Sequence, residues 1–263
     1  MEMMTDFLNR ERCGVHVRGQ NYSVALRTIG DGFSSAVVRE IAEEIVNASD
    51  FILGPYTSTL TSVLAPVAQH AGKLLVASGA ATTSIFSGRD HVFGLLPPSG
   101  TYFGETIRSL SSDYQAKSLA YFFEDTSFTT SACSTIPELS DAYNMTLLNA
   151  TKVSADPSQA DLQPLVPRLA RLDPDVVLAC VRQTGCESWV NALKANGWAP
   201  KASVMTICVG SSTFNAAVGD DARFFMGASP WDPSLPLTDE IWVGRRRTSI
   251  ANSPLRQTRK QHI

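Results

Sequence analysis

Residues 51–83, FILGPYTSTLTSVLAPVAQHAGKLLVASGAATT, contain two short apolar segments, each followed by a loop of small and hydroxyl-bearing residues. We predict strands at Phe51–Gly54 and Leu74–Ala77, with loops at Pro55–Ser58 and Ser78–Thr82. An amphipathic helix is predicted between the strands, so they are expected to be parallel neighbours. In open α/β sheets, ligands bind beyond the carboxyl ends of such strands.

Both loops lack bulky side chains, so a ligand can approach their backbone closely. Each loop leads toward a helix N-terminus, where unpaired N–H groups and the helix dipole favour a negative charge. We therefore predict that Ser58 and the segment Ala80-Ala81-Thr82 present free amide hydrogens to a small anion or zwitterion. The alternatives are that Ser58 only caps the helix at 59–71 and that the second loop is only a tight turn.

The composition is that of an ordinary globular protein. The chain has 263 residues, of which 44% are apolar and 18% charged, and a formal charge of −3. This charge favours neither nucleic acid nor a membrane surface as a partner. No apolar run is long enough for a transmembrane helix, and the start, MEMMTDFLNRERC, lacks the pattern of a secretory signal. Residues 244–263 hold six basic side chains and no acidic one, and we expect a disordered tail there.

The five cysteines form neither a C-x-x-C pair nor a zinc-binding spacing. We expect buried free thiols and at most one disulfide, for which Cys180 and Cys208 are the first candidates because each lies near a predicted strand end. Four Asn-x-Ser/Thr sequons also occur, at Asn21, Asn47, Asn144 and Asn149. They exceed the number expected by chance and favour a secreted glycoprotein.

Strands and helices alternate along the chain, and the alternation restarts after residue 113. The predicted strands are 22–28, 51–54, 74–77, 91–96, 118–123, 145–153, 175–180, 202–208 and 223–228. The predicted helices are 2–10, one capped by Ser34, 59–71, 102–110, 129–141, 161–172 and 185–195. This alternation is typical of parallel sheets covered on both faces, and the restart predicts two such units with a cleft between them.

The string ILGPYTSTLTSVLAPVAQHAGKLLVASGAATTSIF, continued by HVFGLLPPSGTYFGE, resembles type I periplasmic binding proteins of the branched-chain amino acid group. The strings SLAYFFEDTSF and DLQPLVPRLARLDPDVVLAC resemble the second lobe of the same family. The resemblance implies an α/β fold of two Rossmann-like lobes with parallel sheets, which close about a hinge over a small polar ligand. It implies lobe 1 at 1–114, lobe 2 at 115–225 and a partial return toward lobe 1 at 226–243.

Carried over by position, the resemblance implies that the ligand's carboxylate and amino groups meet Ser58 and the loop Ala80-Ala81-Thr82. It further implies an aromatic contact from Phe128 and a polar contact from Gln183. The family often places an acidic or polar partner for the ligand amine near the end of the strand at 202–208. This chain has Cys208 and Val209 there, so an ammonium group lacks its counter-charge at that position.

The family also has a strand before the helix that opens this chain, and further elements after its last predicted strand. We therefore expect a chain truncated at both ends, with a first lobe lacking its first strand. The neighbours of that strand are then expected to lack hydrogen-bond partners and to expose apolar faces.

The leading hypothesis is a non-enzymatic solute-binding protein, extracellular or periplasmic, that binds an amino acid or a similar small molecule. Its partner would be a membrane transporter or a receptor domain. The alternative is the ligand-sensing fragment of a eukaryotic receptor, namely a receptor cyclase, a receptor kinase or a class C G-protein-coupled receptor. An α/β enzyme is disfavoured because no G-x-G-x-x-G, P-loop or metal cluster occurs. We expect no catalytic residue, metal or cofactor, and a nonfunctional remnant remains a further alternative.

Overall fold

The structure is a computed structural model that describes residues 2–229. The predicted segment 244–263 and all but the first four residues of the predicted segment 226–243 lie outside the described residues. Contacts within residues 2–228 form one unit, which contains all the elements described below.

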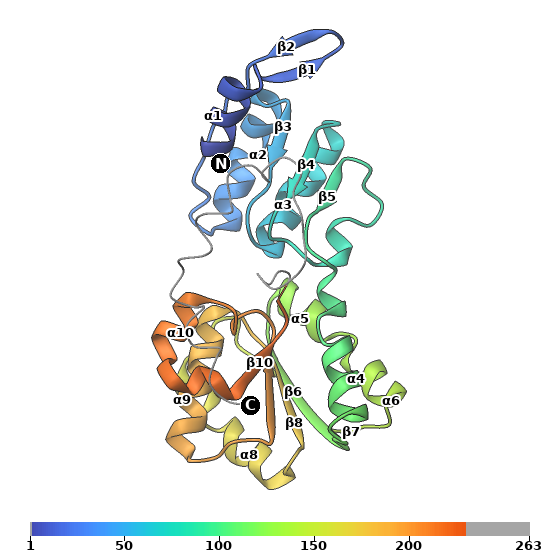
Figure 1. The fold of residues 1–263 in the computed structure, drawn as a ribbon, viewed down its shortest axis with the longest axis vertical. Helices are drawn as coiled ribbons and strands as arrows, with labels where there is room; N and C mark the ends of the chain where they lie inside the picture. The colour runs from blue at the N-terminus through green and yellow to red at the C-terminus, as the bar shows by residue number, and fades with distance from the viewer. Residues whose placement is uncertain (1, 230–263) are drawn as a thin grey trace. The chain divides into compact units, whose positions relative to one another are not determined.

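Most predicted strands and helices of the first half are confirmed, with small shifts at their ends (Figure 1). The helices are α1 (Glu2–Glu11), α2 (Ser35–Ala48), α3 (Ser58–His70) and α4 (Gly104–Ser112), with 3₁₀ turns η1 (Thr83–Ile85) and η2 (Ser99–Thr101). The strands are β1 (Val15–Val17), β2 (Gln20–Tyr22), β3 (Phe51–Leu53), β4 (Leu74–Ala77) and β5 (Val92–Gly94).

In the second half, two predicted helices are each divided into two, and one further helix is present. The helices are α5 (Ser127–Cys133), α6 (Ile136–Ala142), α7 (Gln159–Leu162), α8 (Leu165–Leu172), α9 (Gln183–Asn196) and α10 (Ser212–Val218), followed by the 3₁₀ helix η3 (Gly219–Phe224). The strands are β6 (Ser118–Glu124), β7 (Thr146–Val153), β8 (Val176–Cys180), β9 (Ala202–Met205) and β10 (Phe225–Gly227).

Two parallel sheets organise these elements, as the alternation predicted. The first sheet has the order β3-β4-β5 and the second the order β10-β9-β8-β6-β7 (Figure 1). All pairs within both sheets are parallel. The fold is therefore α/β with Rossmann-like halves, as expected.

The second sheet carries a separate apolar cluster on each face. Along β8, Val176, Leu178 and Cys180 pack into the cluster that includes α4, α5 and α6. Val177 and Ala179 pack into the cluster of α8 and α9, where Trp189 and Phe122 are in ring contact. Because β8 is buried on both faces, its sequence is a continuous apolar run rather than an alternating one.

Local sequence signals fix several helix ends. The Ser34 hydroxyl caps α2 by accepting from the N–H of Val37, as predicted. Helix α3 is capped by Thr57, whose hydroxyl accepts from the N–H of Leu60 at 3.2 Å. The predicted alternative in which Ser58 caps this helix is therefore wrong, because the preceding residue holds the capping position.

The predicted strand at 22–28 is wrong. Only Gln20–Tyr22 forms a strand, and it pairs with β1 in an antiparallel hairpin. The tight turn of this hairpin has Arg18 and Gly19 at positive φ, which matches the twist of a two-residue hairpin loop. The backbone N–H and C=O of Val24 bond instead with the Asn9 side chain, at 2.7 and 2.8 Å. A side-chain amide thus takes the place that a neighbouring strand would fill.

Strand β3 forms an edge of the first sheet and is apolar on its exposed side. Phe51 and Leu53 are 72% and 51% exposed, whereas Ile52 between them is buried. Two large apolar side chains of this edge strand are therefore in contact with solvent, and the expected lack of a first strand stays a prediction.

The predicted disulfide pattern is wrong in both number and pairing. The structure contains two disulfides, Cys133–Cys180 and Cys186–Cys208, and Cys13 is free and exposed. Cys180 and Cys208 were expected to pair with each other. They do not because Cys180 faces the cluster that contains α5, whereas Cys208 lies in the cluster of α9 on the other face of the sheet.

Asp175 joins the starts of three strands of the second sheet. Its carboxylate accepts from the backbone N–H groups of Lys117 and Ser118, at 2.8 and 3.1 Å, and forms an ion pair with Lys201. These bonds favour the charged form, and the hydrogen bond from Lys201 is the largest cause. They lower the pKa of Asp175 from 3.8 to about 2.

The first prediction is that Asp175→Asn lowers the free energy of unfolding by about 1–2 kcal/mol near neutral pH, a value reduced because Lys201 is exposed. Because the folded-state pKa is depressed, this stabilisation is full above about pH 4 and is lost as the pH falls toward about 2. Urea unfolding of both proteins at about pH 6 and about pH 3 measures it. An equal difference at both pH values would contradict the assignment.

Candidate ligand-binding site

The loops after β3 and β4 meet through one buried hydroxyl. Ser58 Oγ accepts from the backbone N–H groups of Ala81 and Thr82, at 3.1 and 3.4 Å. Ser58, Ala80 and Ala81 are each at most 1% exposed, and Thr82 is 6% exposed. The structure thus brings these four predicted site residues together. The prediction of free amide hydrogens is wrong for Ala81 and Thr82, because the hydroxyl of Ser58 accepts from both.

A groove of about 620 Å³ lies beside this junction. Hydroxyl side chains make up most of its lining, which consists of Thr82, Thr83, Ser84, Gly100, Asp125, Thr126, Ser127, Thr130, Ser131, Ser134 and Thr135. One side comes from the loop after β4, η1 and η2, and the other from the loop after β6 and helix α5. Of the six predicted site residues, Thr82 alone lines the groove.

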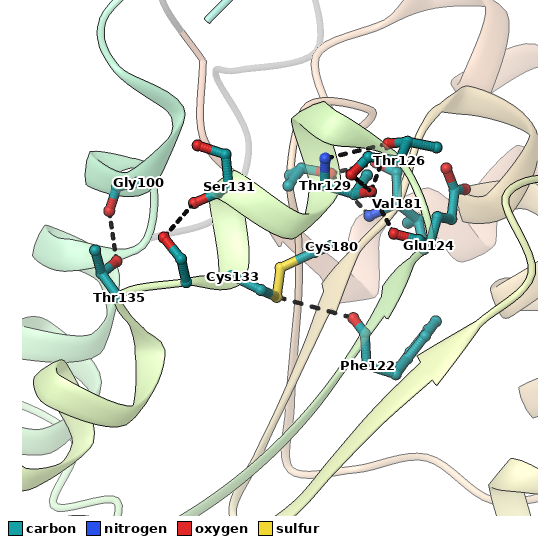
Figure 2. Close-up of a disulfide and its surroundings, with 12 residues drawn as sticks. Gly100, Phe122, Glu124, Thr126, Thr129, Ser131, Cys133, Thr135, Cys180 and Val181 are labelled. Carbon is teal, nitrogen blue, oxygen red and sulfur yellow. Dashed lines mark hydrogen bonds between the residues drawn. A yellow bond between two sulfur atoms is a disulfide. The ribbon is translucent and has the colours of Figure 1, made fainter. Parts of the chain in front are cut away.

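Hydrogen bonds connect the two sides of the groove. Thr82 Oγ1 donates to the carbonyl of Ser127 at 3.2 Å. Ser99 Oγ bonds with Ser131 Oγ at 2.7 Å, and Thr135 Oγ1 donates to the carbonyl of Gly100 at 2.6 Å (Figure 2). The segment from Ser127 to Thr135 therefore meets the first half of the chain along its whole length.

Phe128 and Gln183, the remaining predicted site residues, lie outside the groove lining. Phe128 is partly buried and packs edge-on against Tyr102, with ring centroids 6.0 Å apart. Gln183 is the first residue of α9, and its side-chain amide donates to Glu187 Oε1 at 2.8 Å. The structure gives both side chains partners within the protein.

A buried carboxylate lies at the end of β6, behind the groove. Glu124 is fully buried, and its two oxygens accept from the backbone N–H and the Nε of Arg182, at 3.0 and 2.7 Å. Burial raises the pKa of Glu124, and the bonds from Arg182 oppose that rise. Gly185 packs directly against this carboxylate, where a Cβ would collide with Oε1.

The sequence alone left two interpretations of Arg182, a salt bridge to a ligand carboxylate or a solvated loop charge. The structure instead pairs it with Glu124 of the same chain. Its guanidinium also donates to the carbonyl of Ala155 and lies 3.5 Å from Asp156. The available signal was Glu124, which continues the buried strand β6 directly after its apolar run, because a buried charge requires a partner.

The neighbouring carboxylate, Asp125, faces the groove and is exposed. It forms an ion pair with Lys152 at 3.0 Å, and both side chains are more than half exposed. Asp125 is the only charged residue among those that line the groove in the described part of the chain.

The described residues contain no cluster of side chains typical of a metal site. Between residues 2 and 229, no group of three or more His, Cys, Asp or Glu side chains is placed to hold a metal ion. Within the same range, no helix combines the length and apolar character needed to cross a membrane.

Comparison with protein families identifies the fold. The family model described as periplasmic binding protein matches residues 11–244, which is most of the chain. The chain belongs to the periplasmic binding protein family.

Solved structures of periplasmic binding proteins share this fold. An ABC transporter substrate-binding protein from Desulfitobacterium hafniense superposes with a TM-score of 0.71 at 16% identity, covering 90% of this chain and 67% of its own. The branched-chain amino acid binding protein LivJ from Streptococcus pneumoniae, in complex with isoleucine, gives 0.78 at 14% identity, covering 92% and 68%.

A third periplasmic binding protein carries a different ligand. The solute binding protein from Rhodopseudomonas palustris, in complex with 3,4-dihydroxybenzoic acid, gives a TM-score of 0.62 at 17% identity, covering 77% of this chain and 55% of its own. The chain therefore spans 55% to 68% of the length of these three structures. At such identities the likeness shows the fold, and nothing in it supports the receptor alternative or the glycoprotein assignment.

The second prediction concerns the buried ion pair of this periplasmic binding protein. Arg182→Met leaves the Glu124 carboxylate buried without a cation, so we expect the free energy of unfolding to fall by about 3 kcal/mol near neutral pH. This is the lower end for broken buried pairs because Arg182 is partly exposed. The loss should shrink as the pH falls toward the ordinary pKa of Glu, because a protonated Glu124 needs no cation.

Urea unfolding of a double-mutant cycle measures this coupling. Glu124→Gln combined with Arg182→Met should recover most of the stability that the single Arg182→Met change removes. A double variant as unstable as the sum of the two single variants would show that the two side chains do not interact.

Proposed function

We propose that this chain is a non-enzymatic solute-binding protein that binds a small carboxylic acid, in the first place an amino acid, at the groove beside Thr82. The observation that carries the proposal is the convergence of the Ala81 and Thr82 amides on Ser58 Oγ at the carboxyl ends of two parallel strands. Ligands of open α/β sheets bind at this end of the strands. The named neighbours, which bind isoleucine and an aromatic acid, support a carboxylate-bearing ligand.

The junction at Ser58 is suited to hold a carboxylate oxygen at its two amides, with the Ser58 hydroxyl turned to donate to the same carboxylate. Two N–H groups already point at one oxygen, and a charged acceptor forms stronger bonds to them than a hydroxyl does. Thr82 adds its own hydroxyl, which now donates to a backbone carbonyl across the groove. A carboxylate bound here would therefore be held by groups whose positions the fold has already fixed.

The predicted lobes are 1–114 and 115–225, and we propose that two lobes, one built on each parallel sheet, close about the bound ligand. Helix α4 belongs with the second lobe, because its apolar side chains pack into a cluster of the second sheet. The groove takes its lining from both halves of the chain, so a ligand in it touches both. Such a ligand favours the state in which both sets of contacts form. An ABC-type membrane transporter is the proposed partner, at a periplasmic or extracellular location.

The role of Asp125 differs between the two ligand classes that this proposal allows, amino acids and hydroxylated aromatic acids. An amino acid brings an ammonium group, and Asp125 is the carboxylate in the groove that can accept it, in place of Lys152. A hydroxylated aromatic acid has no ammonium group and leaves that ion pair intact. The hydroxyl-rich lining fits the second class, so both classes belong in the test.

The third prediction is that Ser58→Ala weakens ligand binding about tenfold or more, which is about 1.4 kcal/mol, because one buried polar contact is lost. Calorimetry with L-isoleucine and 3,4-dihydroxybenzoate as probes measures the affinity. Ser62→Ala is the matched control, because this hydroxyl is on the same helix and bonds only to the carbonyl of Thr59. The proposal fails if neither probe binds at millimolar concentration or if Ser58→Ala binds as the unaltered chain does.

The fourth prediction uses Asp125→Asn to identify the ligand class. If the ligand is an amino acid, this change lowers the affinity for L-isoleucine by about 1–3 kcal/mol, because the ammonium group loses its charged partner. Binding of 3,4-dihydroxybenzoate is then unaffected or absent. If the ligand is an acid without an ammonium group, only the benzoate binds and Asp125→Asn does not change its affinity. Folding is preserved because the ion pair with Lys152 is exposed.

A further inference from the structure

The two disulfides of the second sheet lie on its opposite faces and have different neighbours. Cys133–Cys180 belongs to the cluster that contains α5, and Cys186–Cys208 belongs to the cluster of α8 and α9. All four cysteines are at most 2% exposed. The face that carries Cys133 is also the face from which α5 reaches the groove (Figure 2).

Helix α5 and its flanks supply six of the eleven residues that line the groove, namely Thr126, Ser127, Thr130, Ser131, Ser134 and Thr135. The helix has only seven residues, too few to be stable without tertiary contacts. Its position therefore depends on the contacts of its inward face.

Three residues make up the inward face of α5, and each is held by a different kind of interaction. Thr129 Oγ1 donates to the backbone carbonyl of Glu124 at 2.6 Å, near the start of the helix. Ala132 is fully buried in the apolar cluster. Cys133, the last residue of the helix, is covalently joined to Cys180 at the end of the central strand β8. The disulfide is thus the covalent anchor of the helix end, next to Ser134 and two residues from Ser131 and Thr135.

We infer that the Cys133–Cys180 disulfide positions one side of the binding groove. It holds the end of α5 against β8, close to the hydroxyls of α5 and its flanks that line the groove. The bond fixes the helix end whose neighbours Ser131 and Thr135 meet Ser99 and Gly100 across the groove (Figure 2). Without this disulfide, the end of α5 can move away from β8. The hydroxyls on the α5 side then no longer lie within hydrogen-bond distance of their partners on the other side of the groove. The consequence for ligand affinity rests on the function proposed above, whereas the consequence for α5 does not.

The other disulfide provides a matched control. Cys186–Cys208 closes a separation of 22 residues and joins α9 to the loop after β9, and neither cysteine lines the groove. Removing it takes away the same number of sulfur atoms, from an apolar cluster on the other face of the same sheet. A purely structural role of disulfides predicts that both removals loosen the second sheet without singling out α5.

The experiment compares hydrogen–deuterium exchange of backbone amides in Cys133→Ala/Cys180→Ala, in Cys186→Ala/Cys208→Ala and in the unaltered chain. We expect exchange in residues 127–135 to rise about tenfold or more in the first variant and to be unchanged in the second. Affinities for L-isoleucine and 3,4-dihydroxybenzoate, measured on fully folded protein, should fall about tenfold in the first variant for the probe that binds, and less than about twofold in the second.

Each outcome decides the inference or the proposed function separately. Unchanged exchange of α5 in the first variant, or an equal rise in both variants, overturns the inference. If the unaltered chain binds neither probe, the proposed function fails, and exchange alone still tests whether the disulfide positions α5. If α5 loosens but the affinity of a bound probe does not change, the link between α5 and binding is overturned.

A second pair of variants keeps the inference testable if the first variant does not fold. Thr129→Val removes the hydroxyl anchor of α5 and nearly preserves its volume. Ser140→Ala is its control, because this buried hydroxyl on α6 donates to the carbonyl of Pro137 and does not line the groove. Thr129→Val should raise α5 exchange and lower affinity, while Ser140→Ala should change neither. The opposite result overturns the dependence of the groove on the inward face of α5.

Discussion

The hydrogen bonds between Ser58 Oγ and the amides of Ala81 and Thr82 fix the geometry on which the groove depends. They join the loops after two parallel strands, β3 and β4, which are neighbours in the first sheet. Because Thr82 is held by this junction, its hydroxyl is directed across the groove to the carbonyl of Ser127. The buried hydroxyl of Ser58 thus positions the loop after β4, which forms one side of the groove. It thereby also sets the contact of this loop with α5, on the other side.

Part of the hydrogen-bonding capacity in and beside the groove is already used within the protein. The amides at Ser58, the Ser99–Ser131 hydroxyl pair and the Thr135 bond to Gly100 are all satisfied. A ligand that binds at these groups must exchange internal hydrogen bonds for new ones, and the net gain of such an exchange is small for each bond. Affinity then depends on how many protein groups contact the ligand at the same time. This requires the two sides of the groove to keep fixed positions relative to each other. This requirement connects Ser58 in one half with α5 in the other.

The sequence predicted the α/β fold and the adjacency of the loops at Ser58 and Thr82, because periodicity and strand–helix alternation are local signals. The sequence did not predict that the Ser58 hydroxyl would accept hydrogen bonds from the amides of Ala81 and Thr82. Which acceptor a buried N–H group finds is known only once the contact between the two loops is known. Residues 129–135 were interpreted only as part of a helix that begins after the loop at 124–128, since the hydroxyls that line the groove have no periodic signature. The disulfides were also mispredicted, because pairing depends on which face of the second sheet each cysteine occupies.

The two adjacent carboxylates at the end of β6 show how the fold controls the charge of the groove. Glu124 points into the protein, where Arg182 neutralises it and also binds the segment at 155–156. Asp125 points outward and is paired with Lys152 at the surface. Neither carboxylate presents an unpaired charge to the groove, so its hydroxyls act in a nearly neutral environment. Recognition there depends on the geometry of hydrogen bonds more than on net charge, and only the exposed pair, Asp125 with Lys152, can be rearranged at small cost to suit a charged ligand group.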